Sequence, residues 1–361
     1  LNRGVRGSSP RPPTKSGILM FRNATLTEAQ IAAIRVARER RFAMAKRRGA
    51  GKRINQFIQA VVGFTLVGLL RLMPLDQASG LAGWIGEKVL ARSQRNEKIE
   101  RTMRVPFPNL TDEELWRLTR EMSGNVMRVF AELAHLRAFT GTDNPRFRIS
   151  GLENIEAAKT GGRGVLFSAG HFGNWETSEI ILRNLGLDGA VSIMPPTNPF
   201  VFGWLARQRY SVGLSEQVGA GEGVYRTLSK TLRDGRIALM LADQRVGNGI
   251  KVPFFGVETV TNVLPAWLAR RTKVAVVPLS IRRVADARVA FDVAFRPALR
   301  YEATGNPDAD DVAFMSRINA FYEDEVRAVP EQWLWGHPRW DDAIFGLQPK
   351  RIRGASAAVD E

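Results

Sequence analysis

The chain has 361 residues, of which 44% are hydrophobic and 24% are charged, and it contains no cysteine. This length and apolar content are enough for a buried core in one large or two ordinary domains. The lack of cysteine excludes disulfides, thiolate nucleophiles and cysteine-ligated zinc or iron–sulfur sites.

The formal net charge of +16 is concentrated near the N-terminus. Residues 1–53 contain 14 lysines and arginines against two glutamates, so we expect a basic, partly disordered arm. Because the arm directly precedes an apolar run, its basicity favours an anionic membrane surface. A membrane-tethered nucleic-acid-binding protein is the weaker alternative, since basic and aromatic residues are not interleaved as in a recognised nucleic-acid-binding module.

The most hydrophobic segment lies within residues 54–73, and its continuous apolar part runs from Phe57 to Leu70. That part is shorter than the roughly 20 residues that a helix needs to span a bilayer core. A spanning anchor, an interfacial helix and a buried core helix therefore all stay open for this segment.

The next part of the chain has helical patterning. We expect one helix over residues 75–101 and a second that begins with a capping box at Thr111 and Glu114 and continues to Phe139. His135 lies near the end of the second helix without metal-ligand spacing, so we expect it to be a packing residue.

From residue 147 the pattern alternates between strands and helices. The expected strands are 147–149, 165–169, 191–194, 237–242, 274–281 and 289–295, and the expected helices are 174–185, 198–210, 222–234, 263–271 and 310–328. Such alternation predicts an α/β domain over residues 75–341, with a central, mostly parallel or mixed sheet flanked by helices. A polar tail over residues 342–361 follows.

The polar residues His171, Asn174 and Glu176 come directly after an apolar strand that Gly170 interrupts. An α/β sheet usually presents its chemistry at this kind of position. His171 and Glu176 are separated by about 140° on an ideal helix. They meet only if His171 precedes the helix and Glu176 reaches back from its first turn. The carboxylate would then orient the imidazole, which would accept a proton from an alcohol. A capped helix with a hydrogen-bonded histidine is the alternative.

Three later segments carry further candidate residues. Arg207 and Arg209 end an aromatic helix and suit a phosphate or carboxylate, although a solvated helix end has the same pattern. Asp243 follows a strand, where it serves a site or caps a turn. His337 and Arg339 lie in an aromatic cluster near the end of the fold.

These blocks together resemble the bacterial lipid A biosynthesis acyltransferases, the lauroyl/myristoyl transferase family. The H-x-x-x-x-E arrangement of His171 and Glu176 resembles the family signature, and the other blocks occur in family order: Asn198-Pro with Arg207 and Arg209, Asp243-Gln with Val252-Pro-Phe-Phe-Gly256, and Gln332-Trp-Leu-Trp-Gly-His337-x-Arg339. The resemblance covers about residues 55–341. The chain departs from the family at Arg101-Thr102, where the family often has Arg-Asn, and at Arg245, where it often has a second acidic residue.

The resemblance implies that a fatty acyl chain moves from acyl carrier protein to a hydroxyl of a lipid A precursor. It places the catalytic domain at the cytoplasmic face of the bacterial inner membrane, which favours an interfacial or re-entrant anchor. It implies His171 as general base assisted by Glu176, no metal, nucleotide or other cofactor, and a set of supporting residues: Asn174, Arg207, Arg209 and Asp243 for substrate binding, with His337 and Arg339 in support. The same fold acting on another phospho(glyco)lipid or a lysophospholipid is the alternative.

Overall fold

The computed structural model of the chain describes residues 50–346, apart from short gaps at 93–95, 160, 195, 197, 214–215, 220–221, 286–287 and 338. Most of the predicted basic arm (1–53) and of the predicted polar tail (342–361) therefore lies outside the described residues. The domain boundaries stay a prediction.

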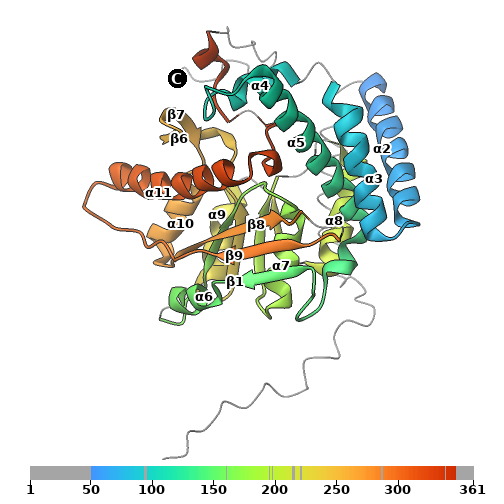
Figure 1. Cartoon of the computed structure of the whole chain (residues 1–361). Helices are drawn as coiled ribbons and strands as arrows, with labels where there is room; N and C mark the ends of the chain where they lie inside the picture. The colour runs from blue at the N-terminus through green and yellow to red at the C-terminus, as the bar shows by residue number, and fades with distance from the viewer. Residues whose placement is uncertain are drawn as a thin grey trace, which may run out of the picture.

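A seven-stranded sheet forms the centre of the fold (Figure 1). Its strands lie in the order β1-β9-β8-β2-β5-β3-β4, and every neighbouring pair is parallel except β8 and β9. Their bounds are β1 (Phe147–Ser150), β2 (Leu166–Ala169), β3 (Gly189–Ile193), β4 (Glu216–Gly219), β5 (Ile237–Leu241), β8 (Val276–Arg283) and β9 (Phe291–Phe295). The predicted α/β fold with a mostly parallel sheet is confirmed.

Helices pack on both faces of this sheet, because successive strand residues bury their side chains on opposite sides. Leu166 belongs to the apolar cluster on one face, while Phe167 belongs to the cluster on the other. The first cluster includes residues of α5 (Asp112–Glu132), α9 (Glu222–Arg233), α10 (Leu264–Thr272) and α11 (Pro307–Ala328). The second includes residues of η3 (Leu133–Phe139), α6 (Leu152–Ala158), α7 (Ser178–Asn184) and α8 (Pro199–Val212). Each fully buried Leu, Val or Phe contributes about 1.5–3 kcal/mol to this packing.

Four of the strands and α-helices were not predicted. Strand β4 is short and polar, and α6 has only seven residues, so neither has a clear periodic pattern. Residues 245–261, for which no strand was predicted, form the antiparallel hairpin of β6 (Arg245–Phe254) and β7 (Val257–Thr261). The first half of β6 is polar and largely exposed, which hides the strand alternation that its buried second half shows.

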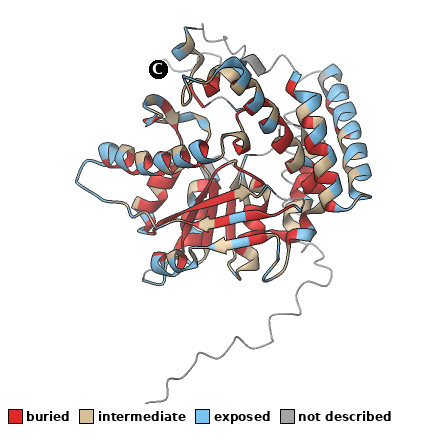
Figure 2. Ribbon diagram, in the orientation of Figure 1, coloured by how far each residue is buried: buried red, intermediate tan, exposed pale blue. Residues whose placement is uncertain are grey.

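The first described helix, α2 (Ala50–Arg71), lies on the outside of the domain beside α3 (Leu75–Lys88) (Figures 1 and 2). Its apolar stretch from Arg53 to Arg71 is long enough to cross a membrane, yet only 11% of it is buried in the fold. A plain core helix is therefore wrong for this segment.

The other helical predictions are partly confirmed. The segment 75–101 is divided into α3, η2 (Leu90–Arg92) and α4 (Asn96–Met103). The capping box of Thr111 and Glu114 begins α5 as predicted. His135 has a non-helical φ of −120° between α5 and the end of η3, and its Nε2 lies 3.1 Å from the carbonyl oxygen of Leu70. It is a packing residue that ties α2 to the domain.

Candidate active site

The candidate site lies at the carboxyl ends of the parallel strands β2 and β5. Ala169 and Leu241 are paired at the ends of these strands, and His171 and Asp243 each follow two residues later. The pairing thus brings together two residues that are 72 positions apart in the sequence. This edge of a parallel sheet is where α/β proteins place their ligands.

His171 and Asp243 form a closely bonded pair. Nδ1 of His171 lies 2.7 Å from Oδ1 of Asp243, and the backbone N–H of His171 donates to Oδ2 at 2.9 Å. The indole N–H of Trp333 donates to the same Oδ2 at 2.7 Å. Burial raises the pKa of Asp243, but the charge and hydrogen bonds of His171 outweigh it and hold that pKa below its usual range.

The ionised Asp243 determines which tautomer His171 adopts. A carboxylate only accepts hydrogen bonds, so Nδ1 carries the proton and the lone pair of the neutral ring is on Nε2. Nε2 has no hydrogen-bond partner among the described residues. The ring is 20% exposed, so Nε2 is available as a base.

The backbone around His171 is bonded to a segment near the end of the fold. The N–H of Leu334 donates to the carbonyl of His171 at 3.0 Å, and the N–H of Gly173 donates to the carbonyl of Gln332 at 3.2 Å. Gly173 has φ +54°, and a Cβ there would lie 2.6 Å from the carbonyl oxygen of Ile281. The loop of residues 170–174 therefore requires glycine at this position, and His171 lies before the helix as predicted.

Glu176 has a different partner from the one predicted. Its two carboxylate oxygens accept hydrogen bonds from Nη2 of Arg209 at 2.6 Å and from Nε at 2.8 Å. Burial raises the pKa of Glu176, but the charge and hydrogen bonds of Arg209, with a smaller effect of His171, hold it below its usual range. The prediction that Glu176 orients the ring is wrong, because Asp243 makes the bond to Nδ1.

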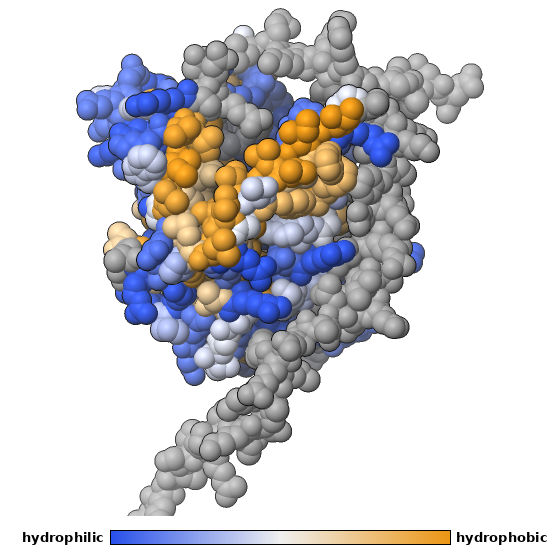
Figure 3. Space-filling model, turned by 90° about the vertical axis from the view of Figure 1, so that its right-hand side faces the viewer, coloured by the Kyte–Doolittle hydropathy of each residue, from blue (hydrophilic) through white to orange (hydrophobic). Residues whose placement is uncertain are grey.

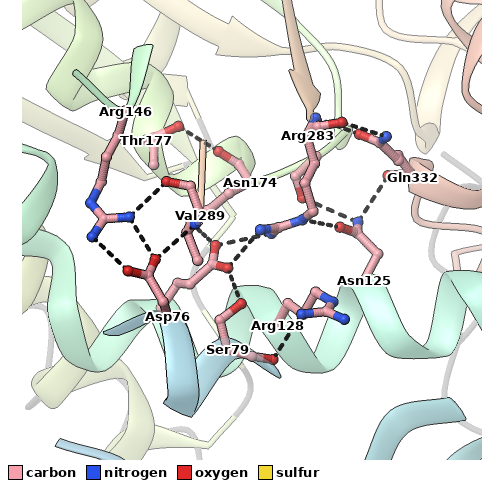
Figure 4. Close-up of polar contacts among 12 residues, drawn as sticks. Asp76, Ser79, Asn125, Arg128, Arg146, Asn174, Thr177, Arg283, Val289 and Gln332 are labelled. Carbon is pink, nitrogen blue, oxygen red and sulfur yellow. Dashed lines mark hydrogen bonds and ion pairs between the residues drawn. The ribbon is translucent and has the colours of Figure 1, made fainter. Parts of the chain in front are cut away.

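A buried ion pair supports the other side of the loop (Figure 4). Glu132 on α5 accepts two hydrogen bonds from Arg283 at the end of β8, at 2.7 and 3.0 Å. Its two oxygens also accept from the Nδ2 of Asn174 at 2.7 Å and the hydroxyl of Ser79 at 2.6 Å. Asn125 accepts from Nε of Arg283 and donates to the carbonyl of residue 173. The loop is thus held by α3, α5 and β8 together.

A cavity of about 210 Å³ adjoins His171. Glu176, Glu179, Arg209 and Arg245 are the charged side chains among the lining residues. Its apolar wall comes from the ends of β3 and β5 and from the start of β6: Val191, Ile193, Met194, Met240, Leu241, Ala242 and Val246. The arrangement places a base, an ion pair and an apolar wall around one space.

The other predicted site residues are distributed differently. Asn174 is fully buried and bonded to Glu132, so it supports the loop and is not exposed to a substrate. Arg207 is exposed and lines a different cavity, beside α2. His337 is exposed and does not line the His171 cavity. Arg339 is buried under the β6–β7 hairpin, where it donates to the carbonyl of Val260.

Sequence reasoning missed three residues of the site. Trp333 was within a noted block, and a buried indole N–H needs an acceptor, which is the signal that could have linked it to Asp243. Glu132 and Arg283 occur in an ordinary helix and at an ordinary strand end, and nothing local distinguishes them. Asp243 was expected to bind substrate, but it binds His171 instead.

Comparison with known proteins identifies the family of the chain. The family model for bacterial lipid A biosynthesis acyltransferases matches residues 49–342. A lipid A biosynthesis acyltransferase of Haemophilus influenzae is 26% identical over 286 residues, which is 76% of this chain and 85% of that protein. A phosphatidylinositol mannoside acyltransferase of Mycolicibacterium smegmatis is 25% identical over 283 residues, which is 75% of this chain and 88% of that protein. A lipid A biosynthesis palmitoleoyltransferase of Escherichia coli is 26% identical over 204 residues, which is 55% of this chain and 63% of that protein.

The matched region contains both halves of the site, the strand ends with His171 and Asp243 and the segment with Trp333. The chain is an acyltransferase and belongs to the bacterial lipid A biosynthesis acyltransferase family.

Proposed function

We propose that the chain transfers a fatty acyl group from an acyl carrier protein thioester to a hydroxyl of a lipid A precursor. The observation that carries the proposal is Nε2 of His171, which has no hydrogen-bond partner in the described part of the chain, while Nδ1 is held by a buried, ionised Asp243. A base of this kind suits the deprotonation of an alcohol. The acceptor class is supported by the names of the relatives from Haemophilus influenzae and Escherichia coli.

In the proposed reaction, Nε2 of His171 takes the proton of the acceptor hydroxyl as its oxygen attacks the thioester carbonyl. The new C–O ester bond forms and the C–S bond breaks. The imidazolium then returns its proton to the departing thiolate of the carrier. Asp243 stabilises the imidazolium while it exists, as an orienting carboxylate does in a serine–histidine–aspartate triad. This direct transfer requires no covalent enzyme intermediate.

The apolar wall of the cavity suits the acyl chain. Met240 and Leu241 on β5 and Ile193 on β3 line it beside His171. A hydrocarbon chain against these side chains would leave the thioester carbonyl near the ring. The positive net charge of the chain would attract an acidic carrier protein.

We also propose that α2 attaches the protein to the bacterial inner membrane, with the catalytic domain on the cytoplasmic side. Apolar side chains are gathered on the face of the molecule that carries α2 (Figure 3). Those on the outer side of α2 include Ile58, Val62, Leu66 and Leu69, each about half exposed. They repeat at helical spacing, which supports insertion into a lipid surface.

Acyl transfer by the purified protein tests the proposal. The protein is incubated with acyl carrier protein charged with a fatty acid and with one of three acceptors: a lipid A precursor, a phosphatidylinositol mannoside or a lysophospholipid. Mass spectrometry then identifies the acylated product. We expect ester formation on the lipid A precursor, and no transfer to it would contradict the proposal. Transfer to the mannoside alone would favour the second acceptor class, which the Mycolicibacterium smegmatis relative suggests.

A further inference from the structure

Arg207 and Arg209 leave α8 on opposite sides. Two positions on a helix correspond to about 200° of rotation. Arg209 turns inward and pairs with Glu176, whereas Arg207 turns outward toward α2. The guanidinium of Arg207 is exposed and has no hydrogen bond or ion pair within the described part of the chain. It is a free cation on the far side of α8 from His171.

The outer face of α8 and the neighbouring α2 enclose a groove of about 280 Å³. Phe200, Gly203, Trp204 and Arg207 follow the spacing i, i+3, i+4 and i+7, so they lie on one face of α8. Phe64 completes the lining from α2, and its ring centroid lies 5.9 Å from that of Trp204. Gly203 has no side chain and lines the groove with its backbone between Phe200 and Arg207.

The groove combines features that suit one class of molecule. Its aromatic walls favour a hydrocarbon chain, since the rings of Phe64, Phe200 and Trp204 present mostly apolar surface. The guanidinium at its edge suits a phosphate, which it binds with two parallel N–H donors. The exposed apolar face of α2 continues from the groove, so a lipid in a membrane would reach both. An amphiphile with an acyl chain and a phosphate is complementary to the whole surface.

We propose that the groove between α2 and α8 binds one anionic phospholipid of the membrane, with its acyl chain between Phe64 and Trp204 and its phosphate on Arg207. This lipid is distinct from the acyl acceptor, because α8 separates its phosphate from His171. It would connect the membrane to the same helix that holds Glu176 through Arg209. The inference rests on the membrane attachment proposed above for α2.

The experiment uses phospholipids that carry bromine on their acyl chains, which quench a tryptophan that they touch. Vesicles contain phosphatidylcholine and phosphatidylglycerol in equal parts, with one of the two lipids brominated at a time. The difference in fluorescence between the native protein and Trp204→Phe isolates the contribution of Trp204. We expect brominated phosphatidylglycerol to quench this contribution more strongly than brominated phosphatidylcholine.

Arg207→Gln should lower the apparent affinity for brominated phosphatidylglycerol, measured by quenching of Trp204, about fivefold. This decrease corresponds to about 1 kcal/mol. Arg233→Gln is the matched control, because it removes the same charge from an exposed position at the end of α9, away from the groove. Equal quenching by both brominated lipids would mean simple immersion in the bilayer and would overturn the proposal. So would an Arg207→Gln protein that behaves like the Arg233→Gln protein.

Flotation with the same vesicles distinguishes the two proposals. A protein that floats with the vesicles but whose Trp204 is not quenched overturns only the groove. A protein that does not float overturns membrane attachment as well. Circular dichroism of each variant verifies its fold, and Arg207 and Arg233 are both exposed, so their substitution leaves the core unchanged.

Discussion

Trp333 and His171 bind the carboxylate of Asp243 from 90 positions after it and 72 positions before it in the sequence. The indole N–H and the backbone N–H of His171 both donate to Oδ2 of Asp243, while Oδ1 is left for the imidazole. The carboxylate therefore cannot rotate without losing a hydrogen bond. The indole of Trp333 and the backbone N–H of His171 thus fix the carboxylate that orients the imidazole ring. This division of the oxygens leads to the first prediction.

Asp243→Asn should lower kcat by about 10²- to 10⁴-fold with little change in KM, because the amide that replaces the carboxylate no longer stabilises the imidazolium. His171→Ala should be at least as inactive. Both are measured by acyl transfer from acyl carrier protein at saturating acceptor. Thermal unfolding of each variant is the control for folding. Full activity in either variant would eliminate the proposed base.

Glu176→Gln should destabilise the protein by about 3 kcal/mol, since it leaves the partly buried charge of Arg209 without its partner. The double variant Glu176→Gln/Arg209→Met should recover part of that loss. Urea unfolding of the native, single and double variants measures both effects. We expect kcat to fall less in Glu176→Gln than in Asp243→Asn. Unchanged stability with an equal loss of kcat would instead mean that Glu176 acts directly in the reaction.

The pH dependence of stability follows from the two carboxylates of the site. The pKa values of Asp243 and Glu176 are both lowered in the folded protein, whereas the unfolded values are about 3.9 and 4.3. Between the folded and the unfolded pKa of each carboxyl group, the unfolded chain therefore binds more protons than the folded protein. The free energy of unfolding decreases as the pH is lowered through that range. As the pH is lowered from neutral, the urea midpoint of unfolding should start to decrease near about pH 4. The midpoint of the Asp243→Asn variant should decrease less steeply. An equally steep fall in that variant would contradict the assignment.

Glu132→Gln should cost about 3–5 kcal/mol of folding stability, because Arg283 keeps a buried charge without an ionised partner. The control is Glu302→Gln, which breaks the exposed pair of Glu302 with Arg317 and should cost less than about 1 kcal/mol. Urea unfolding compares the two variants directly. Equal losses would show that the Glu132–Arg283 pair stabilises no more than a surface pair does.

Leu66→Asp should reduce binding to anionic vesicles several-fold without affecting the fold, since Leu66 is 54% exposed on the outer face of α2. Leu152→Asp makes the same change at another exposed leucine, at the start of α6, and should leave vesicle binding intact. Flotation of both variants measures the difference. Unaltered flotation of Leu66→Asp would mean that α2 is not the membrane contact.

Much of the fold was predictable because its signals are local. The buried strands β2, β5 and β8 are largely apolar, and α5 and α8 begin at side-chain caps. The position of His171 before a helix followed from the glycines on either side of it. The hairpin of β6 and β7 was missed because its stability depends on packing against α11, which the local pattern does not contain.

The partners of the site residues were harder to predict than their positions. Glu176 is near His171 in the sequence, and this closeness favoured it over Asp243, which only the pairing of β2 with β5 brings near. Arg209 was expected to bind an anionic ligand, and its observed anion is the protein's own Glu176. Residues that act through long-range contacts, such as Glu132 with Arg283, have no sequence pattern that separates them from surface charges.

The bridge between Phe172 and Trp333 also makes the site depend on a segment that follows the whole sheet in the sequence. The last strand of the sheet ends at Phe295, so all seven strands precede Trp333. Without that segment, Asp243 lacks its indole donor and the carbonyl of His171 lacks the N–H of Leu334. A chain that ended before Trp333 would lack both hydrogen bonds, so we expect it to perform the proposed acyl transfer less efficiently than the full chain, even with all seven strands present.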